Sequence, residues 1–335
     1  MKSRLLGLVK YLLLSCAGAG LLFLTFRGQN LGQIYRDISH ADYFWIGLSL
    51  FASLLAYISR AWRWNLLIEP LGYKPLLHHS FFSLMAGYLA NLAIPRIGEV
   101  TRCASLSRAG KIPFSILLGT VVAERVIDVI SLLLLSCLAL ALEFDKLGGF
   151  AYRHILIPAA GRLATVTQNF PLLWILLLSG TALLAAFFLI KRYSLGNTLL
   201  GEKAANFIRG LLHGFKSVLK MKNNKLFLLH TFFIWTMYFL TSYFCFFALP
   251  ATSGLGPAAG LFALVVGGFG MSAPVQGGFG TFHLFVSRGL QLYQVSLTDG
   301  LVFATLVHTF QTIFAIFLGG LSFFFLIFSK KEATA

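Results

Sequence analysis

The chain has 335 residues, of which 58% are hydrophobic and only 11% are charged, and its mean hydropathy is +0.81. Soluble domains contain about 45–50% apolar residues, so this composition excludes a soluble protein and predicts an all-α, polytopic membrane protein. The net charge of +16 does not indicate a nucleic-acid partner, because the Lys and Arg residues flank apolar segments, where they face anionic lipid headgroups.

Six segments are long enough to cross a bilayer, which requires about 20 mostly apolar residues. In chain order they are residues 5–26, 43–68, 112–142, 171–190, 226–249 and 299–328. The first segment continues past Cys16, which favours an uncleaved span over a signal peptide. The four cysteines are scattered singly, so they predict neither a disulfide framework nor a metal site.

Two further apolar regions are interrupted by proline. Residues 77–111 break at Pro95 and then carry several charges, and residues 257–297 break at Pro274 within a glycine-rich stretch. Both breaks have the pattern Pro-x-x-Gly. Paired interrupted segments in the two halves of a chain are typical of inverted-repeat transporters, so we expect two opposed re-entrant helical hairpins whose breaks meet near the membrane centre. The alternative is two ordinary helix breaks between tightly packed small residues.

Basic residues define the expected topology. Three lie near the N-terminus, and residues 191–225 carry eight Lys/Arg against the single Glu202, which places both stretches in the cytoplasm. An even number of crossings separates them only if residues 77–111 enter and leave on one side. We therefore expect a single transmembrane domain over residues 1–335, in a bacterial inner membrane, with both termini cytoplasmic. Residues 202–222 are amphipathic and predict an interfacial helix on anionic lipid, with a solvated connector as the alternative.

Ionisable residues inside apolar segments are costly, so they indicate either function or a structural salt-bridge lock. The two clusters of this kind are Arg96, Glu99 and Arg102, and Glu124, Arg125 and Asp128. Glu124 and Asp128 share a helical face. Three arginines and three carboxylates sum to zero, so a closed network could satisfy all six without a ligand. Alternatively, the arginines hold a phosphate near the Pro95 break while the carboxylates balance the charge.

The glycine-rich stretch is not a nucleotide-binding loop, because it lacks the lysine and hydroxyl residue of that motif. We expect Gln276, Gly277 and Gly278 to let backbone amides approach a ligand or another helix. His283 and His308 follow, and each is interpreted either as a satisfied hydrogen-bonding residue or as a proton relay. No metal-ligand spacing or catalytic set is evident, so we expect no metal, no cofactor and no enzymatic activity.

Several motifs together resemble one known family. They are Pro95-Arg96-x-Gly98-Glu99 with Arg102, Gly110-Lys111-x-Pro113, Glu124-Arg125-x-x-Asp128, Pro274-x-x-Gly277-Gly278-x-Gly280 and residues 38–45. This combination is similar to the flippase-like family typified by the membrane region of lysylphosphatidylglycerol synthases, and the similarity covers nearly the whole chain. The resemblance implies translocation of a lipid or a polyprenyl-linked lipid.

The chain departs from that family at two positions. His283 stands where the family commonly has an acidic residue, and His308 stands near the position where the family has a basic Arg in the final span. The substrate or coupling ion is therefore expected to differ. The synthases also carry a soluble transferase domain after the membrane region, whereas this sequence stops at Ala335. Aminoacylation of lipid is therefore not expected for this chain alone.

We therefore predict a lipid translocase that moves an anionic phospholipid, glycolipid or polyprenyl-phosphate lipid between leaflets. The headgroup is expected to contact Arg96, Arg102 and Arg125, with the three carboxylates balancing charge and the Gln276 turn opposite. The expected partners are membrane lipids, with a second copy of the chain or a lipid-synthesis enzyme as further candidates. The alternatives are a membrane-embedded transferase acting on a lipid carrier, for which residues 143–170 offer little material, and a non-catalytic scaffold of a lipid or glycan synthesis complex.

Overall fold

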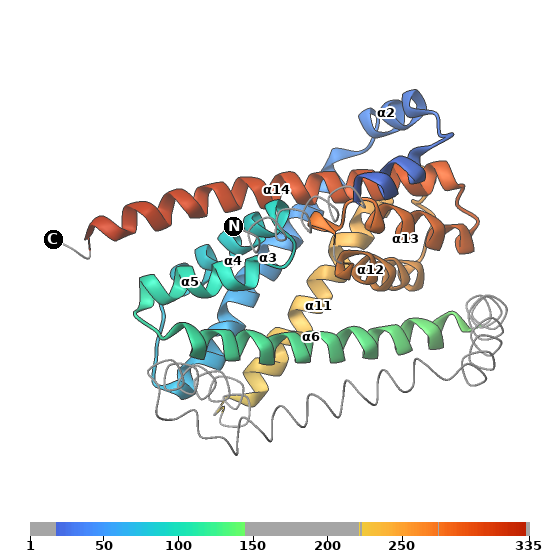
Figure 1. Cartoon of the computed structure of the whole chain (residues 1–335). Helices are drawn as coiled ribbons and strands as arrows, with labels where there is room; N and C mark the ends of the chain where they lie inside the picture. Colours follow the sequence, from blue (N-terminus) through green and yellow to red (C-terminus); the bar gives the residue numbers. More distant parts are fainter. Residues whose placement is uncertain (1–17, 145–220, 222, 274, 333–335) are drawn as a thin grey trace, which may run out of the picture. The chain divides into compact units, whose positions relative to one another are not determined.

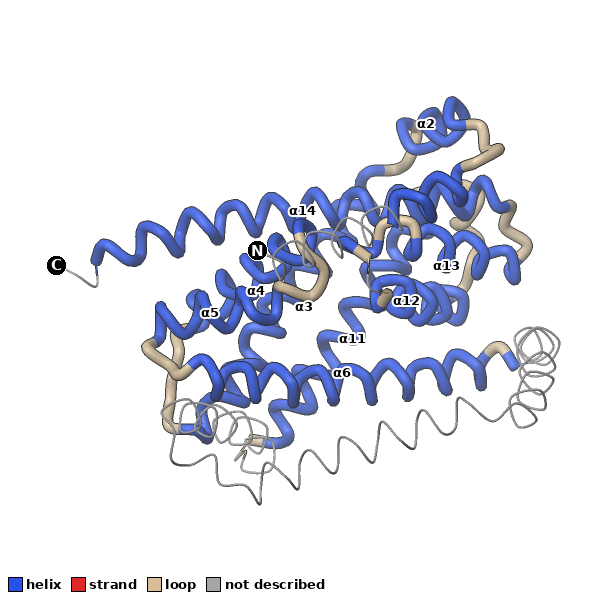
Figure 2. The backbone as a smooth tube through the Cα atoms, in the orientation of Figure 1, coloured by secondary structure: helices blue, strands red, loops and turns tan. Residues whose placement is uncertain are grey.

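The computed structural model describes residues 18–144, 221, 223–273 and 275–332, and the secondary structure of these residues is helical (Figures 1 and 2). Nearly all of them belong to one compact unit formed by residues 1–139 and 211–335. Some predicted elements lie outside the described residues: the span 171–190, residues 5–17 of the first span, residues 202–220 of the interfacial helix, and Pro274 itself.

Among the described residues, four helices are long and apolar enough to cross a membrane. They are α3 (Tyr43–Ile68), α6 (Phe114–Leu142), α11 (Asn224–Phe247) and α14 (Leu297–Glu332). These helices confirm four of the six predicted spans as long apolar helices. The remaining described part of the first predicted span, residues 18–26, is also helical.

The first interrupted region forms two helices that lie side by side, α4 (Leu77–Ala93) and α5 (Gly98–Gly110). Helix α4 stops just before Pro95, which has no backbone N–H to continue the helix. A Cβ atom on Gly98 would collide with the carbonyl oxygen of Gly87, and the Gly98 amide donates to Asn91 Oδ1 at 2.6 Å. The glycine of the Pro-x-x-Gly pattern therefore permits the close approach of the two helices.

The second interrupted region also forms a helical pair, α12 (Pro257–Ser272) and α13 (Thr281–Leu290), joined through the short 3₁₀ helix η5 (Gln276–Gly278). Helix α13 is followed by a further 3₁₀ turn, Gln291–Tyr293, within the predicted interrupted region. Gly270 packs against the Phe282 backbone, where an added Cβ would come within 2.9 Å of Phe282 Cα. The Thr281 hydroxyl donates to the Gly270 carbonyl at 2.7 Å and holds the pair together.

The core of this unit lies between α11, α13 and the first half of α14, with Phe246, Val286 and Phe303 almost fully buried. Many large apolar side chains of α6, α11 and α14 are exposed instead; examples are Leu133, Leu134, Phe232, Phe317 and Phe323. Such surfaces are stable against lipid tails but not in water.

One helix was not predicted from the sequence. Helix α2 (Leu31–Ser39) begins at Asn30, whose side chain accepts a hydrogen bond from the Gln33 amide at 3.1 Å. Its only buried residue is Ile34. A nine-residue helix with one buried side chain leaves too weak an apolar pattern to recognise.

Candidate functional site

Two arginines of α3 face two carboxylates of α6 inside the helical unit. Arg60 Nη2 lies 2.5 Å from Glu124 Oε1, and Arg63 Nη2 lies 2.6 Å from Asp128 Oδ1. Crossed pairs, Arg60 with Asp128 and Arg63 with Glu124, are both 3.3 Å long. Residues three and four apart share a helical face, so the two pairs of side chains match across the helix contact. The predicted shared face of Glu124 and Asp128 is confirmed.

Three more charged residues extend this network. Arg102 Nη2 of α5 lies 3.1 Å from Glu124 Oε2. Arg125 lies between Glu99 and Asp128, with nitrogen–oxygen distances of 3.4 and 3.5 Å. We call the whole set the arginine–carboxylate cluster; its members are Arg60, Arg63, Arg102, Arg125, Glu99, Glu124 and Asp128.

The cluster corrects the predicted charge balance. Arg60 and Arg63 were not recognised as site residues, and with them four arginines face three carboxylates, which gives a net charge of +1 when all are ionised. The expectation of neutrality was therefore wrong. The available signal was two arginines three residues apart within the apolar segment 43–68.

Arg96 also lies elsewhere than predicted. It is exposed, and its Nη2 is 3.4 Å from the carbonyl oxygen of Ser272 rather than in an ion pair with the cluster. Its φ of 63° is the left-handed conformation, which is uncommon for a residue other than glycine. The predicted Arg96, Glu99 and Arg102 set is therefore divided between two locations.

Burial within the cluster is graded. The side chains of Arg63 and Glu124 are fully buried and that of Arg102 is 3% exposed, whereas those of Arg125 and Glu99 are 39% and 29% exposed. Within the described part of the chain, the buried Nε atoms of Arg60, Arg63 and Arg102 and the Nη1 of Arg102 have no hydrogen-bond partner. Buried N–H groups normally have partners, so these donors leave unused binding capacity.

Aromatic residues enclose the buried end. The guanidinium of Arg102 lies over the Trp64 ring at 4.8 Å, and Arg60 Nη1 donates to the Tyr238 hydroxyl at 3.0 Å. Trp64 is itself fixed by a 2.9 Å hydrogen bond from its Nε1 to Thr120. These contacts hold the guanidinium planes in defined orientations, which is a requirement for recognising a planar or tetrahedral anion.

The two helix breaks lie against each other. Gln276 Nε2 is 3.4 Å from the Ala93 carbonyl oxygen, and a Cβ on Gly277 would lie 2.9 Å from Leu92 Cδ2. Gly277 and Gly278 have φ values of 53° and 73°, which favour glycine. The turn that contains Gln276, Gly277 and Gly278 is thus in contact with the end of α4, in agreement with the prediction that the two breaks meet.

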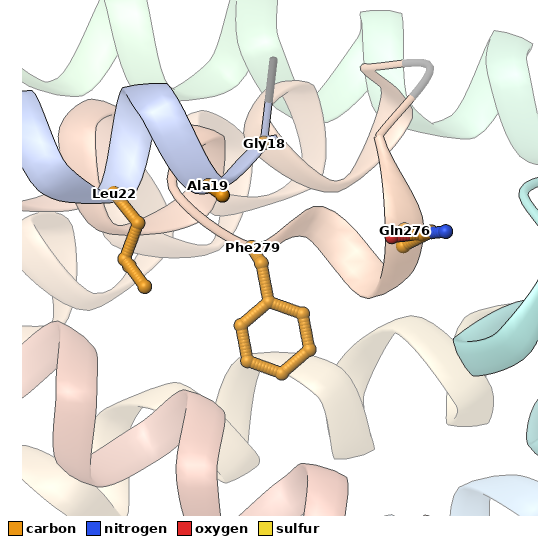
Figure 3. Close-up of a pocket in the computed structure, with 5 residues that line it drawn as sticks. All are labelled: Gly18, Ala19, Leu22, Gln276 and Phe279. Carbon is orange, nitrogen blue, oxygen red and sulfur yellow. The ribbon is translucent and has the colours of Figure 1, made fainter. Parts of the chain in front are cut away.

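A small pocket borders the second break on its other side. It has a volume of about 210 Å³ and is lined by Gly18, Ala19, Leu22, Gln276 and Phe279 (Figure 3). Its lining is mainly apolar apart from Gln276. The pocket belongs with the break rather than with the charged cluster.

The structure brings His283 and His308 together. Their ring centroids are 5.0 Å apart, and His308 Nε2 lies 2.7 Å from the Gly277 carbonyl oxygen. The two histidines were interpreted separately from the sequence. They become neighbours because α13 packs on α14. The described residues contain no group of three potential metal ligands.

Residues 7–319 match the family described as the lysylphosphatidylglycerol synthase TM region. The chain belongs to this family. With four helices able to cross a bilayer, this member of the synthase membrane-region family is an integral membrane protein. The resemblance stated from the Pro95, Glu124 and Pro274 motifs is therefore confirmed.

A curated relative of this family member is the UPF0104 membrane protein MJ1595 of Methanocaldococcus jannaschii. The two sequences are 26% identical over 158 residues, which cover 46% of this chain and 42% of the relative. The match thus spans less than half of the relative's length. No solved structure matches the chain.

Proposed function

We propose that the protein is a lipid translocase, which moves an anionic phospholipid, glycolipid or polyprenyl-phosphate lipid between leaflets without changing it chemically. The observation that carries the proposal is the arginine–carboxylate cluster, in which four guanidinium groups face three carboxylates and buried N–H groups lack partners among the described residues. A headgroup phosphate supplies both the missing negative charge and the missing hydrogen-bond acceptors.

The graded burial of the cluster supports an entry route for the headgroup. Arg125 and Glu99 form its half-exposed end, and a phosphate meets them before the buried Arg102. The exposed Arg96 lies beside the backbone carbonyl of Ser272, at the end of α12. In this proposal Arg96, Arg125 and the buried Arg102 contact the headgroup. Arg60 and Arg63 hold Glu124 and Asp128 in place.

The proposal includes a membrane topology. Six full spans and two opposed re-entrant hairpins, α4–α5 and α12–α13, place both breaks within the bilayer and both termini in the cytoplasm of a bacterium. Two observations support it: the helices of each pair pack against each other, and the breaks are in contact. Helix ends inside a bilayer are stable only when protein covers them or water reaches them.

The experiment measures lipid movement in vesicles that contain the purified protein. Phosphatidylglycerol with a fluorescent NBD label on one acyl chain reports the initial rate, through reduction by dithionite added outside, and acyl-labelled NBD-phosphatidylcholine tests charge selectivity. We expect Arg125→Gln and Arg96→Gln to accumulate and fold normally but to lower the phosphatidylglycerol rate at least about tenfold, as expected when a charged hydrogen bond of about 1.5–3 kcal/mol is lost. Arg108→Gln is the control: Arg108 is an exposed arginine in the last turn of α5, outside the arginine–carboxylate cluster, and its variant should keep the wild-type rate.

Two outcomes contradict the proposal. Wild-type vesicles whose lipids move no faster than those of protein-free vesicles would favour the scaffold interpretation. If activity in the two variants falls only in step with the amount of folded protein, the cluster is a structural lock. Mass spectrometry of the recovered lipid tests the transferase alternative, since translocation leaves the mass unchanged.

A further inference from the structure

His283 and His308 form a buried pair with unused basic nitrogens. The two residues are 3% and 4% exposed, and neither Nδ1 atom has a hydrogen-bond partner among the described residues. A carbonyl oxygen can only accept, so the 2.7 Å contact of His308 Nε2 with Gly277 places the hydrogen on Nε2. The lone pair that can take up a proton is therefore on Nδ1 of His308.

The immediate surroundings of the pair are aromatic. The His308 ring has Phe279 and Phe282 at centroid distances of 4.7 and 5.3 Å, and the His283 ring has Phe26 at 5.9 Å. Among the described residues, the titratable group in contact with each imidazole is the other imidazole. A proton bound here thus has no carboxylate beside it in the part of the chain that the structure describes.

Ionisable groups on the segments around the pair lie elsewhere. Residues 18–26, α12 and η5 contain none. Helix α13 contains Arg288, which is exposed and 3.4 Å from Gln291. The part of α14 up to residue 326 contains Asp299, which is half-buried and 2.6 Å from Ser296. These two charges are held at the ends of their helices, away from the pair.

The pair is tied to the contact between the helix breaks. His308 binds the carbonyl of Gly277, a residue with a left-handed conformation. Gly277 lies against the side chain of Leu92 on α4. The next residue toward the N-terminus, Gln276, contacts the Ala93 carbonyl. Any movement of the His308 ring therefore acts on the turn that closes against the first hairpin.

We propose that His283 and His308 bind the proton that drives lipid movement, and that binding this proton opens the contact between the two breaks. The inference rests on the proposed function, because it names the coupling ion. A proton from one aqueous side adds to a lone pair of Nδ1 and is released to the other side when the pair closes again. No bond other than this N–H forms or breaks.

The opening follows from the chemistry of the pair. Protonation creates a charged N–H donor that has no acceptor in the aromatic surroundings, so the ring must turn or water must enter. A second proton would put two positive charges about 5 Å apart, so the pair takes up a single proton. Either movement disturbs the hydrogen bond to Gly277 and thereby the break contact.

The test uses the same vesicles with and without a gradient of one pH unit, in both orientations. A one-unit gradient shifts a one-proton equilibrium by about tenfold, so the wild-type NBD-phosphatidylglycerol rate should rise in one orientation and fall in the other. The readout is the ratio of the two rates. In His308→Gln this ratio should fall to one. Glutamine Nε2 can still donate to Gly277 but cannot take up a proton, and a proton on His283 does not act on the Gly277 hydrogen bond, which His308 makes in the wild type.

His230→Gln is the control, since His230 of α11 bonds to Ser59 away from the pair and its loss should leave the ratio unchanged. A wild-type ratio of one, with lipid movement intact, overturns the coupling but not the proposed function. No lipid movement under any condition overturns the proposed function instead.

Proton binding is tested independently of transport by ¹⁵N-histidine NMR of the purified protein in detergent. We expect His283 and His308 to take up one proton between them and their titrations to be mutually dependent, so that His308→Gln shifts the titration of His283. Two full, independent protonation steps in the wild type would overturn the inference, whether or not the vesicles show transport.

Discussion

Glu124 is the residue on which three guanidinium groups converge. Its carboxylate accepts from Arg60, Arg63 and Arg102, and its side chain is fully buried. A buried cation that loses its counter-charge is costly, because desolvation is no longer compensated. Loss of this carboxylate should therefore lower the free energy of unfolding more than loss of any one arginine of the cluster.

We predict that Glu124→Gln destabilises the protein by about 3–5 kcal/mol, the usual cost of breaking a buried ion pair from one side. The measurement is thermal unfolding in detergent, together with the yield of folded protein. Glu99→Gln is the control, since Glu99 is part-exposed and bonds to one arginine, and its loss should cost less than about 1 kcal/mol. Equal stability of the two variants would show that burial does not set the strength of these pairs.

The charged residues illustrate what the sequence can and cannot predict about a site. Glu124 and Asp128 were predicted to share a face because helical periodicity is a local property. Their partners on α3 depend on how separate helices pack, and spacing within one helix does not encode that. Arg60 and Arg63 were visible as costly charges within an apolar segment, but the choice between lipid-facing and buried needed the fold.

At the scale of helices, the α4–α5 pair depends on two glycines that touch. An added Cβ on Gly98 would collide with the Gly87 carbonyl oxygen and would lie 2.5 Å from Asn91 Nδ2. The Pro-x-x-Gly pattern predicted the break because proline ends a helix wherever it occurs. It did not predict Gly87 as the opposing surface, since that contact joins residues eleven positions apart across the turn.

We predict that Gly98→Ala separates α4 from α5 and destabilises the fold by about 1–3 kcal/mol, as overpacking of a close contact does. Unfolding in detergent gives the comparison. Gly47→Ala is the matched control: Gly47 lies within α3, an added Cβ meets nothing within 4 Å, and alanine should be neutral or stabilising by up to about 1 kcal/mol. A Gly98→Ala protein as stable as Gly47→Ala would mean that the helices relax apart without cost.

At the scale of the whole molecule, the proposed topology makes residues 74 and 111 appear on one side of the membrane. Both are exposed lysines that flank the α4–α5 pair. A re-entrant pair returns the chain to the side it entered, whereas a pair with one complete crossing does not. Basic residues at both ends favour the cytoplasmic side.

We predict that Lys74→Cys and Lys111→Cys react with a membrane-impermeant maleimide only from the cytoplasmic side, in a protein whose native cysteines have been replaced. Ser253→Cys, exposed after α11, serves as the reference for the opposite side. Whole cells and inverted vesicles give the comparison. Labelling of positions 74 and 111 from opposite sides would overturn the hairpin topology, and with it the entry route proposed for the headgroup.

The surplus positive charge of the arginine–carboxylate cluster has an electrical consequence. A charge that moves through the full membrane field does work of about 2.3 kcal/mol per 100 mV. The cluster carries +1 when empty and zero when it holds a headgroup with one negative charge. The loaded site is then insensitive to voltage, whereas the empty site is not. In a cell with a negative interior, the membrane potential would act on the return of the empty carrier and draw the vacant site toward the cytoplasm.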